Sequence, residues 1–327
     1  MSTAPVISEK LSSASADLNC VCGCTDLVDL GPCREPSIGP RGTDLEAKLN
    51  SHFEAGKLFR CRNCHLGLRL PRPDDQSLAT LYENLPTSRW RNGLLRGSAQ
   101  KFLVKQFDGM SNLRILDVGA FDGTFLASLP KSFSKFAIEP SDATSMLEEQ
   151  GITPLKPFLQ APTAQEEASF DVVTMFDVFE HLTDPLQGMR DLMAYVKPGG
   201  KLFVGTGNLD HWSWKMNAGG HWYLDPIQHV VVGSQRHFVW QAKQLNAASF
   251  RVRSFGHHVG TLKERVSQAS TAFYFGVRNK SGWKRLAVRA MHQLPHFRNL
   301  SHKELMPYTQ ELHDHLLAEF VREETTQ

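Results

Sequence analysis

Short apolar runs alternate with helix-like periods in the middle of the chain. The runs are long enough for strands, and their near-continuous apolar character is typical of strands buried on both faces. Strands that alternate with helices predict a parallel sheet with helices on both faces. The four predicted strands are LRILDVG (113–119), KFAIEP (135–140), FDVVTMFD (170–177) and KLFVGT (201–206).

The segment between the last two runs has helical spacing. Its apolar residues recur every three or four positions until Pro198-Gly199-Gly200 ends the pattern. They are Leu186, Met189, Leu192, Met193 and Val196. The later runs FRVRSFGHHV (250–259) and TAFYFGVRN (271–279) have no clear helix between them, and we expect an antiparallel pair at the sheet edge.

The patterns divide the 327-residue chain into four regions. Residues 1–18 have few large apolar residues and are predicted to be a disordered lead. Residues 19–72 contain all six cysteines, and residues 73–280 contain the alternating strands and helices. Residues 281–327 are predicted to form a helical C-terminal extension, with Leu312, Leu316 and Phe320 as an apolar stripe.

Charge and hydropathy narrow the functional classes. The net charge is only +2, from 36 basic and 34 acidic residues, which argues against a protein built to coat nucleic acid. No apolar run approaches the roughly 18 residues of a membrane span. The N-terminus has no apolar signal core, so we expect a cytoplasmic protein whose cysteines are reduced or metal-bound.

The stretch ILDVGAFDGTFL (115–126) has the pattern of a ligand-binding turn. Ligands of parallel α/β sheets bind beyond the carboxyl ends of the strands, and Gly119 and Gly123 lie just past such an end. Glycine permits tight turning and close approach of a ligand to the backbone. A helix predicted to begin near Thr124 would offer free N–H groups. Glu139 ends the next strand, where an acid can accept hydrogen bonds from both ribose hydroxyls.

The spacing of the glycines argues against a nicotinamide dinucleotide. That ligand's fingerprint is Gly-x-Gly-x-x-Gly, which the stretch lacks. The stretch instead resembles the first motif of the class I S-adenosylmethionine-dependent methyltransferases, with Phe121 replacing the middle glycine and Asp122-Gly123 matching a subset of that superfamily. FAIEPS, FDVVTMFDVFEHLTDP and VKPGGKLFVGTGN resemble the later blocks of the superfamily, in the same order over about 100 residues.

This resemblance implies a fold and a cofactor site. The fold would be a Rossmann-like seven-stranded methyltransferase sheet with helices on both faces. Glu139 would hold the ribose of S-adenosylmethionine (SAM), and the adenine contact would come from near Leu159 or Gln160. Phe176 and Asp177 would lie near the sulfonium. The residues that would line the methionine part are Asp117, Gly119, Ala120 and Gly123.

Two cysteine groups about forty residues apart suit tetrahedral zinc. CRNC (61–64) is a Cys-x-x-Cys pair, whereas Cys20, Cys22 and Cys24 offer two pairings. We favour Cys20 and Cys22 with Cys61 and Cys64, because Cys22-Gly23 has the Cys-Gly sequence of zinc knuckles. Cys24 remains the alternative to Cys22. The segment also resembles the N-terminal zinc-binding domain that precedes certain methyltransferases, including sugar C-methyltransferases, which implies a structural zinc.

Two histidines are candidates for acceptor chemistry, because histidine titrates near neutral pH. His181 follows the predicted strand 170–177. His229 lies in HWYLDPIQHVVVGS (221–234), before a helix that Ser234 could cap. That stretch is similar to the Tyr-x-Glu-His segment of the sugar C-methyltransferases, whose histidine acts as base. Pro226 and Gln228 replace its Tyr and Glu, which weakens the case for C-methylation and makes O-methylation at least as well supported.

Other features have structural and functional interpretations. Trp212, Trp214, Trp222 and Tyr223 could stack on a flat ligand or pack a core. His257-His258 is interpreted as a strand-end pair without a metal role. The segment GWKRLAVRAMHQL (282–294) predicts a helix that packs on the domain or a partner, or contacts a membrane surface peripherally.

Three functional hypotheses follow. The first is a methyltransferase acting on a small-molecule or glycan-linked acceptor. The second is an RNA-modifying methyltransferase that uses the zinc domain for recognition, with a modest basic cluster of Arg60, Arg62, Arg69 and Arg72. The third is a non-catalytic binding protein on the same fold. The acceptor, the methylated atom and the oligomeric state are not fixed by the sequence.

Overall fold

The computed structural model describes residues 19–34, 55–73, 78, 95, 97–140, 144–225, 228–278 and 282–324. The predicted disordered lead at 1–18 lies outside these residues.

Seven strands in the described residues pair into one sheet in the order β10-β11-β8-β7-β4-β5-β6. Their pairing is parallel from β8 to β6, whereas β11 is antiparallel to both β8 and β10. The sheet is therefore mostly parallel, as the alternating pattern predicts. The strands are β4 (Arg114–Val118), β5 (Ser134–Ile138), β6 (Ile152–Lys156), β7 (Phe170–Phe176), β8 (Val196–Gly207), β10 (Ser249–Phe255) and β11 (His315–Val321).

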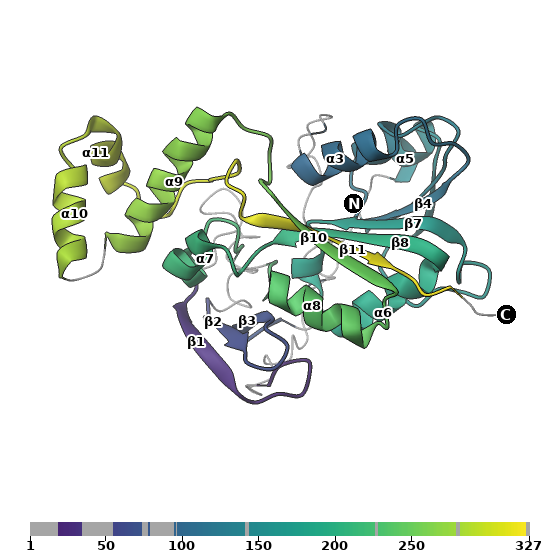
Figure 1. The fold of residues 1–327 in the computed structure, drawn as a ribbon, viewed down its shortest axis with the longest axis horizontal. Coiled ribbons are helices and arrows are strands. Elements are labelled where there is room, and N and C mark those ends of the chain that lie inside the picture. The colour runs from purple at the N-terminus through teal and green to yellow at the C-terminus, as the bar shows by residue number, and fades with distance from the viewer. Residues whose placement is uncertain are drawn as a thin grey trace, which may run out of the picture.

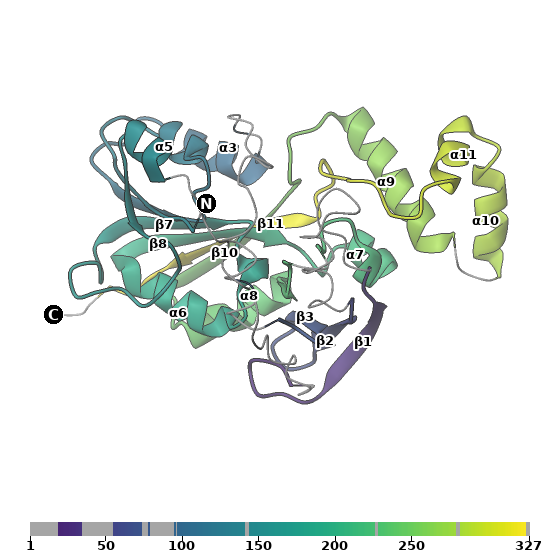
Figure 2. The same cartoon turned by 180° about the vertical axis from the view of Figure 1, so that it is seen from behind.

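Helices cover both faces of this sheet. Figure 1 shows α3 and α5 on one side of it and α6 and α8 on the other, and Figure 2 shows the same layers from behind. Ser234 caps α8 by accepting a hydrogen bond from the His237 N–H. The helix predicted near Thr124 is α4, only four residues long. The helices are α3 (Ser98–Gln106), α4 (Thr124–Ala127), α5 (Thr144–Glu149), α6 (Pro185–Tyr195), α7 (Trp212–Asn217) and α8 (Gln235–Gln244).

The prediction of a wholly helical C-terminal extension is wrong. Helices α10 (Trp283–Met291) and α11 (Pro295–Ser301) are present, but the chain then returns to the main sheet as β11. Every residue from His315 to Phe320 is buried. The apolar spacing of four that predicted a helix also fits a strand, because residues four apart share one face of a strand as well.

The predicted strand at 271–279 is also wrong. These residues lie mostly within α9 (Leu262–Val277), a helix that Thr261 and Glu264 begin with a reciprocal capping box. The strand that pairs with β10 is β11 instead. Helices α9, α10 and α11 form an arm that extends from one end of the sheet (Figure 1).

A second sheet contains residues of the cysteine region. Its order is β1-β2-β3-β9, with β1 (Leu27–Pro32), β2 (Lys57–Cys61), β3 (Gly67–Leu70) and β9 (Val231–Val232). Strand β9 comes from the loop that precedes α8, so two distant parts of the sequence share this sheet. Cys61 and Cys64 belong to the same buried cluster as Met189 of α6 and Phe238 of α8. The cysteine region thus packs into the core beneath the main sheet.

Within the described residues, no helix is both long and apolar enough to cross a membrane. Helix α10 packs Val288 against Tyr274 of α9 and Phe297 of α11. Leu286 and Leu294 of the same segment are exposed. The helix is therefore held by its neighbours on one face and leaves apolar residues on the surface.

Candidate active site and cysteine cluster

The turn after β4 has the backbone conformation that its glycines predict. Gly119 and Gly123 both have φ near +75°, a region that favours glycine. A Cβ on Gly119 would overlap the Val178 side chain, and one on Gly123 would lie 2.7 Å from Ile152 Cδ1. Phe121 also has a positive φ of 51°. The residue that replaces the motif's middle glycine therefore keeps a glycine-like backbone, at an energetic cost.

Two carboxyl groups flank this turn. Oε2 of Glu139 accepts a hydrogen bond of 2.7 Å from the Phe121 N–H, which ties the end of β5 to the turn. Asp117 is buried, and its Oδ1 accepts a hydrogen bond of 2.6 Å from the Thr174 hydroxyl on β7. Burial raises the pKa of Asp117 to about 7, and the nearby Glu139 charge adds to the effect. Ala120 is buried beside the turn.

A hydrogen-bonded group lies beyond the end of β7. The Tyr223 hydroxyl is 2.7 Å from Oδ1 of Asp177 and also bonds Oε1 of Glu180. Thr206 donates to the other oxygen of Glu180 at 2.8 Å. Burial and the Asp177 charge raise the pKa of Glu180 to about 8, so this carboxyl is mainly protonated at neutral pH. A tyrosine hydroxyl has one proton, so it donates to Asp177 and accepts from Glu180.

His181 and His229 lie together in this group. Their ring centroids are 4.7 Å apart and the rings are nearly perpendicular. Burial lowers the pKa of His181 to about 4, and burial together with His181 lowers the pKa of His229 to about 3. Both rings are therefore neutral at pH 7, and neither titrates near neutral pH as its residue type alone predicts. Among the described residues, Nδ1 of His229 is buried without a hydrogen-bond partner.

Two further histidines lie in this site, although the sequence analysis did not assign them to it. His315 is the first residue of β11 and lies opposite Gly207 and Phe255, the last residues of β8 and β10. His257 follows β10, and its Nε2 is 3.2 Å from Oδ2 of Asp177. If residues 315–321 had been predicted as a buried strand, His315 would have been expected at the carboxyl ends of the parallel strands, where ligands bind.

The aromatic residues around 212–223 pack mainly inside the protein. Trp214, Trp222 and Tyr223 are buried in one cluster, and the Trp214 ring stacks on His221 at 3.9 Å. Trp212 is partly exposed. Of the residues proposed near the adenine, Gln160 accepts a hydrogen bond of 3.0 Å from Tyr195 through its carbonyl oxygen. Phe176 packs edge-on against Phe125 of α4, at a ring-centroid distance of 5.1 Å.

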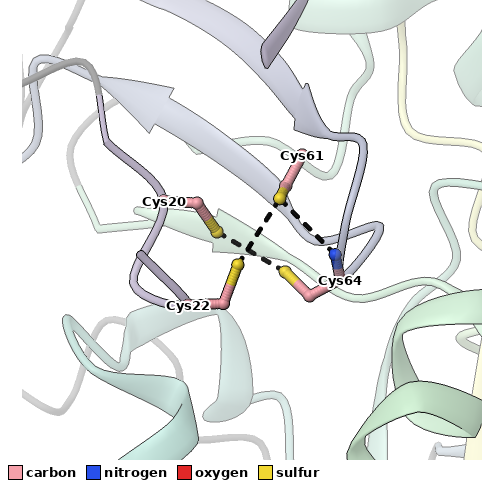
Figure 3. A group of neighbouring side chains, drawn as sticks. All are labelled: Cys20, Cys22, Cys61 and Cys64. Carbon is pink, nitrogen blue, oxygen red and sulfur yellow. Dashed lines mark hydrogen bonds between the residues drawn. The ribbon is translucent and has the colours of Figure 1, made fainter. Parts of the chain in front are cut away.

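Four cysteine sulfur atoms converge on one point. Figure 3 shows Cys20, Cys22, Cys61 and Cys64 turned toward a common centre, and all four Sγ atoms lie within 4.8 Å of one another. The Cys20–Cys64 and Cys22–Cys61 distances between Sγ atoms are 3.4 and 3.6 Å. Zinc–sulfur bonds of about 2.3 Å in a tetrahedron require sulfur atoms roughly 3.8 Å apart. Cys24 instead points its Sγ to the Asp26 carbonyl, 3.7 Å away.

The cysteine region holds the loop that carries His229. Strand β9 begins two residues after His229 and pairs with β3. The carbonyl of Val230 accepts from the Arg69 N–H at 3.0 Å, while its own N–H donates to the Glu180 carbonyl at 2.8 Å. Ring atom Nδ1 of His237 bonds the Cys64 carbonyl at 2.9 Å. The position of His229 therefore depends on the cysteine region.

A mostly parallel sheet with a glycine turn after one strand and an acid after the next defines an α/β enzyme that binds a nucleoside-containing cofactor. The chain belongs to the methyltransferase domain family, whose model matches residues 80–249, just over half of its length. It is a SAM-dependent methyltransferase.

The chain is also similar to ubiquinone biosynthesis O-methyltransferases. The protein of that name from Actinobacillus pleuropneumoniae serotype 7 is 26% identical over 214 residues, which cover 58% of this chain and 92% of the relative. The Histophilus somni protein is 27% identical over 136 residues, covering 38% of this chain and 57% of the relative. The chain thus spans between about half and nine tenths of these relatives.

Solved structures show a more distant likeness. The YcgJ protein of Bacillus subtilis has a TM-score of 0.44 at 14% identity, covering 69% of this chain and 98% of its own. A Haemonchus contortus phosphoethanolamine N-methyltransferase 2 in complex with SAM has a TM-score of 0.45 at 16% identity, covering 77% and 58%. Both TM-scores are below 0.5, so neither likeness bears on the function.

The raised pKa of Asp117 predicts a pH-dependent stability. The folded protein keeps a proton on this carboxyl up to about pH 7, whereas the unfolded chain releases it near the usual value of 3.8. The free energy of unfolding of the wild type should therefore fall, relative to Asp117→Asn, as the pH rises from about 4 to 7. The limiting slope is about 1.4 kcal/mol per pH unit.

Urea unfolding of both proteins at a series of pH values measures this difference. Asp108→Asn, at an exposed position, is the matched control and should follow the wild type. Parallel curves for Asp117→Asn and the wild type would contradict the assignment.

Proposed function

We propose that this methyltransferase transfers the methyl group of SAM to a hydroxyl of a small-molecule or saccharide acceptor, with His229 as the base. The observation that carries the proposal is Nδ1 of His229, which has no partner among the described residues and lies beside Glu180 and His181. The O-methyltransferase names of the relatives favour oxygen over carbon as the methylated atom.

The turn after β4 and the end of β5 would hold the cofactor. The positive φ angles at Gly119 and Gly123 open the turn, so that Asp117 and the backbone can face the methionine part. Glu139 would accept hydrogen bonds from the ribose hydroxyls, and its present bond to Phe121 fixes its direction. When bound, SAM supplies an electrophilic methyl group on a positively charged sulfur. Phe176 and Asp177 would border that group.

The histidine pair would receive the acceptor's proton. His229 is neutral at pH 7 and its Nδ1 is free to accept, among the described residues. His229 would take the proton of the acceptor hydroxyl as its oxygen received the methyl group, and S-adenosylhomocysteine would leave with the electron pair of the carbon–sulfur bond. The protonated ring would be stabilised by the ionised Asp177, whose charge acts to raise the pKa of His229. His181, edge-on to His229, would hold the ring in place.

We further propose that Cys20, Cys22, Cys61 and Cys64 bind one structural zinc ion. Their sulfur atoms are close to tetrahedral spacing, and a site closed by four thiolates leaves no position for water. The segment is small, and a metal supplies folding free energy that a short region cannot obtain from burial alone.

The RNA-modifying alternative has less support. Arg69 is buried, and Arg60 forms an ion pair of 3.2 Å with Asp210. Arg62 pairs with Asp26 at 3.1 Å, and Arg72 donates to the Thr183 carbonyl. Each arginine of the basic cluster is therefore engaged within the fold or with a neighbouring acid. A non-catalytic role disagrees with the family assignment.

Glu139→Gln should weaken SAM binding about 10- to 100-fold, because hydrogen bonds to a charged group contribute roughly 1.5–3 kcal/mol. Isothermal titration calorimetry with SAM and S-adenosylhomocysteine measures the change. Glu148→Gln, exposed on α5, is the matched control and should bind as the wild type does. Equal affinity in Glu139→Gln would remove Glu139 from the cofactor site.

His229→Ala should lower turnover about 100- to 10,000-fold without changing the affinity for SAM, since it removes only the base. Formation of S-adenosylhomocysteine is followed with catechol as a phenolic probe and a nucleotide sugar as a saccharide probe. His302→Ala, exposed on the helical arm, is the control. If His229→Ala turns over at the wild-type rate, another group accepts the proton.

Cys22→Ser should lose the zinc that Cys24→Ser retains, because only Cys22 points into the sulfur cluster. Mass spectrometry of zinc per chain and the thermal unfolding midpoint are the two measurements. The wild type and Cys24→Ser should each contain one zinc ion, and Cys22→Ser should unfold at a lower temperature. The reverse result would assign Cys24 as the ligand.

A further inference from the structure

A second group of side chains that could hold a metal ion lies at the carboxyl edge of the main sheet. One carboxylate oxygen of Asp177 and one ring nitrogen each of His257 and His315 lie within 4.8 Å of one another. The three residues come from three chain segments: the end of β7, the residues after β10 and the start of β11. The sheet topology alone brings them together, because β11 is antiparallel and begins where its neighbours end.

His315 has the surroundings of a metal-bound histidine. Its Nδ1 is 2.8 Å from Oδ1 of Asp314, a fully buried carboxyl. The other oxygen of Asp314, Oδ2, lies 3.4 Å from Nε2 of His221, so both oxygens of this carboxyl face histidine rings. In this contact Nδ1 of His315 donates to the carboxyl oxygen, and the lone pair of Nε2 points away from Asp314. Metal-bound histidines usually donate their other ring N–H to such a carboxylate.

The other ring nitrogen of His315, Nε2, has no hydrogen-bond partner among the described residues. The residue is 5% exposed, and this nitrogen is buried. A buried polar atom without a partner costs free energy, so such atoms in native proteins commonly mark a bound group. Because Asp177 has a side chain about half exposed, a ligand can approach the group from solvent.

A neighbouring triad lacks these features. Glu180, His181 and His229 also lie within 4.8 Å of one another. Unlike Asp177, whose side chain is about half exposed, the Glu180 carboxyl is fully buried. It has no open side for a further ligand. Its raised pKa also favours the neutral acid, which is a poor metal ligand.

We propose that Asp177, His257 and His315 bind a divalent first-row transition-metal ion that receives the acceptor hydroxyl. Two histidines and one carboxylate with open positions suit such ions. The ion would take the place of the direct contact of 3.2 Å between Nε2 of His257 and Oδ2 of Asp177. A hydroxyl bound to the ion is more acidic than a free one, which makes proton removal by His229 easier. Only this role, and not the binding itself, rests on the proposed function.

Manganese(II) is the probe that separates this site from the cysteine cluster, because Mn²⁺ prefers oxygen and nitrogen ligands to thiolates. The full chain is dialysed against citrate to remove weakly held metal. Bound and free Mn²⁺ are then counted by electron paramagnetic resonance. The wild type should bind one Mn²⁺ per chain.

Two ligand variants and one control decide the assignment. His315→Gln and Asp177→Asn should each bind Mn²⁺ at least 10-fold more weakly. His313→Gln is the matched control, since the same substitution two residues away changes an exposed side chain. It should bind as the wild type does. Circular dichroism would check that the variants fold, and Asp177→Asn changes a partly exposed residue outside the core.

Absence of stoichiometric Mn²⁺ binding in the wild type would overturn the proposal. Binding that survives in both His315→Gln and Asp177→Asn would also overturn it. Calorimetry with SAM on the same samples tests the proposed function separately. A chain that binds SAM without Mn²⁺ refutes the metal site alone, and one that binds Mn²⁺ without SAM refutes the cofactor assignment alone.

Discussion

The rest of the structure depends on the pairing of β11 with β8 on one side and β10 on the other. Leu316 and Phe320 face the core shared with α6, α8 and the cysteine region, while Leu317 faces the core under α3. Each such side chain contributes roughly 1.5–3 kcal/mol by leaving water. The same strand places Asp314 and His315 at the ligand edge. One segment of seven residues therefore stabilises both faces of the sheet and completes the site.

Local patterns predicted the central part of the fold. Apolar residues predominate in β4 and β7, in the last three residues of β5 and at residues 202–204 of β8, and Ser234 caps α8 through a contact three residues away. Motif spacing was enough to identify the family, because Asp117, Gly119 and Glu139 lie at strand ends whose order is fixed by the chain. These features depend on neighbours in sequence.

The other parts of the fold and of the site were not predictable from local patterns, because they depend on contacts between residues far apart in the sequence. The spacing of Leu312, Leu316 and Phe320 is compatible with a helix and with a strand, and only pairing with β8 decides between them. His257 and His315 have no local pattern that marks them as site residues. Their proximity follows from strand order. The choice between Cys22 and Cys24 likewise depends on how the turn at Gly23, with φ of +81°, directs the two side chains.

The pairing of β11 with β8 has a consequence for biosynthesis. Gly207 and His315 are partners, yet more than a hundred residues separate them in the chain. During translation, the edge of β8 that pairs with β11 has no partner until the whole helical arm has been synthesised. Exposed apolar edges invite pairing with other chains. The nascent protein thus passes through an interval in which this edge of the sheet is open to pairing with other chains.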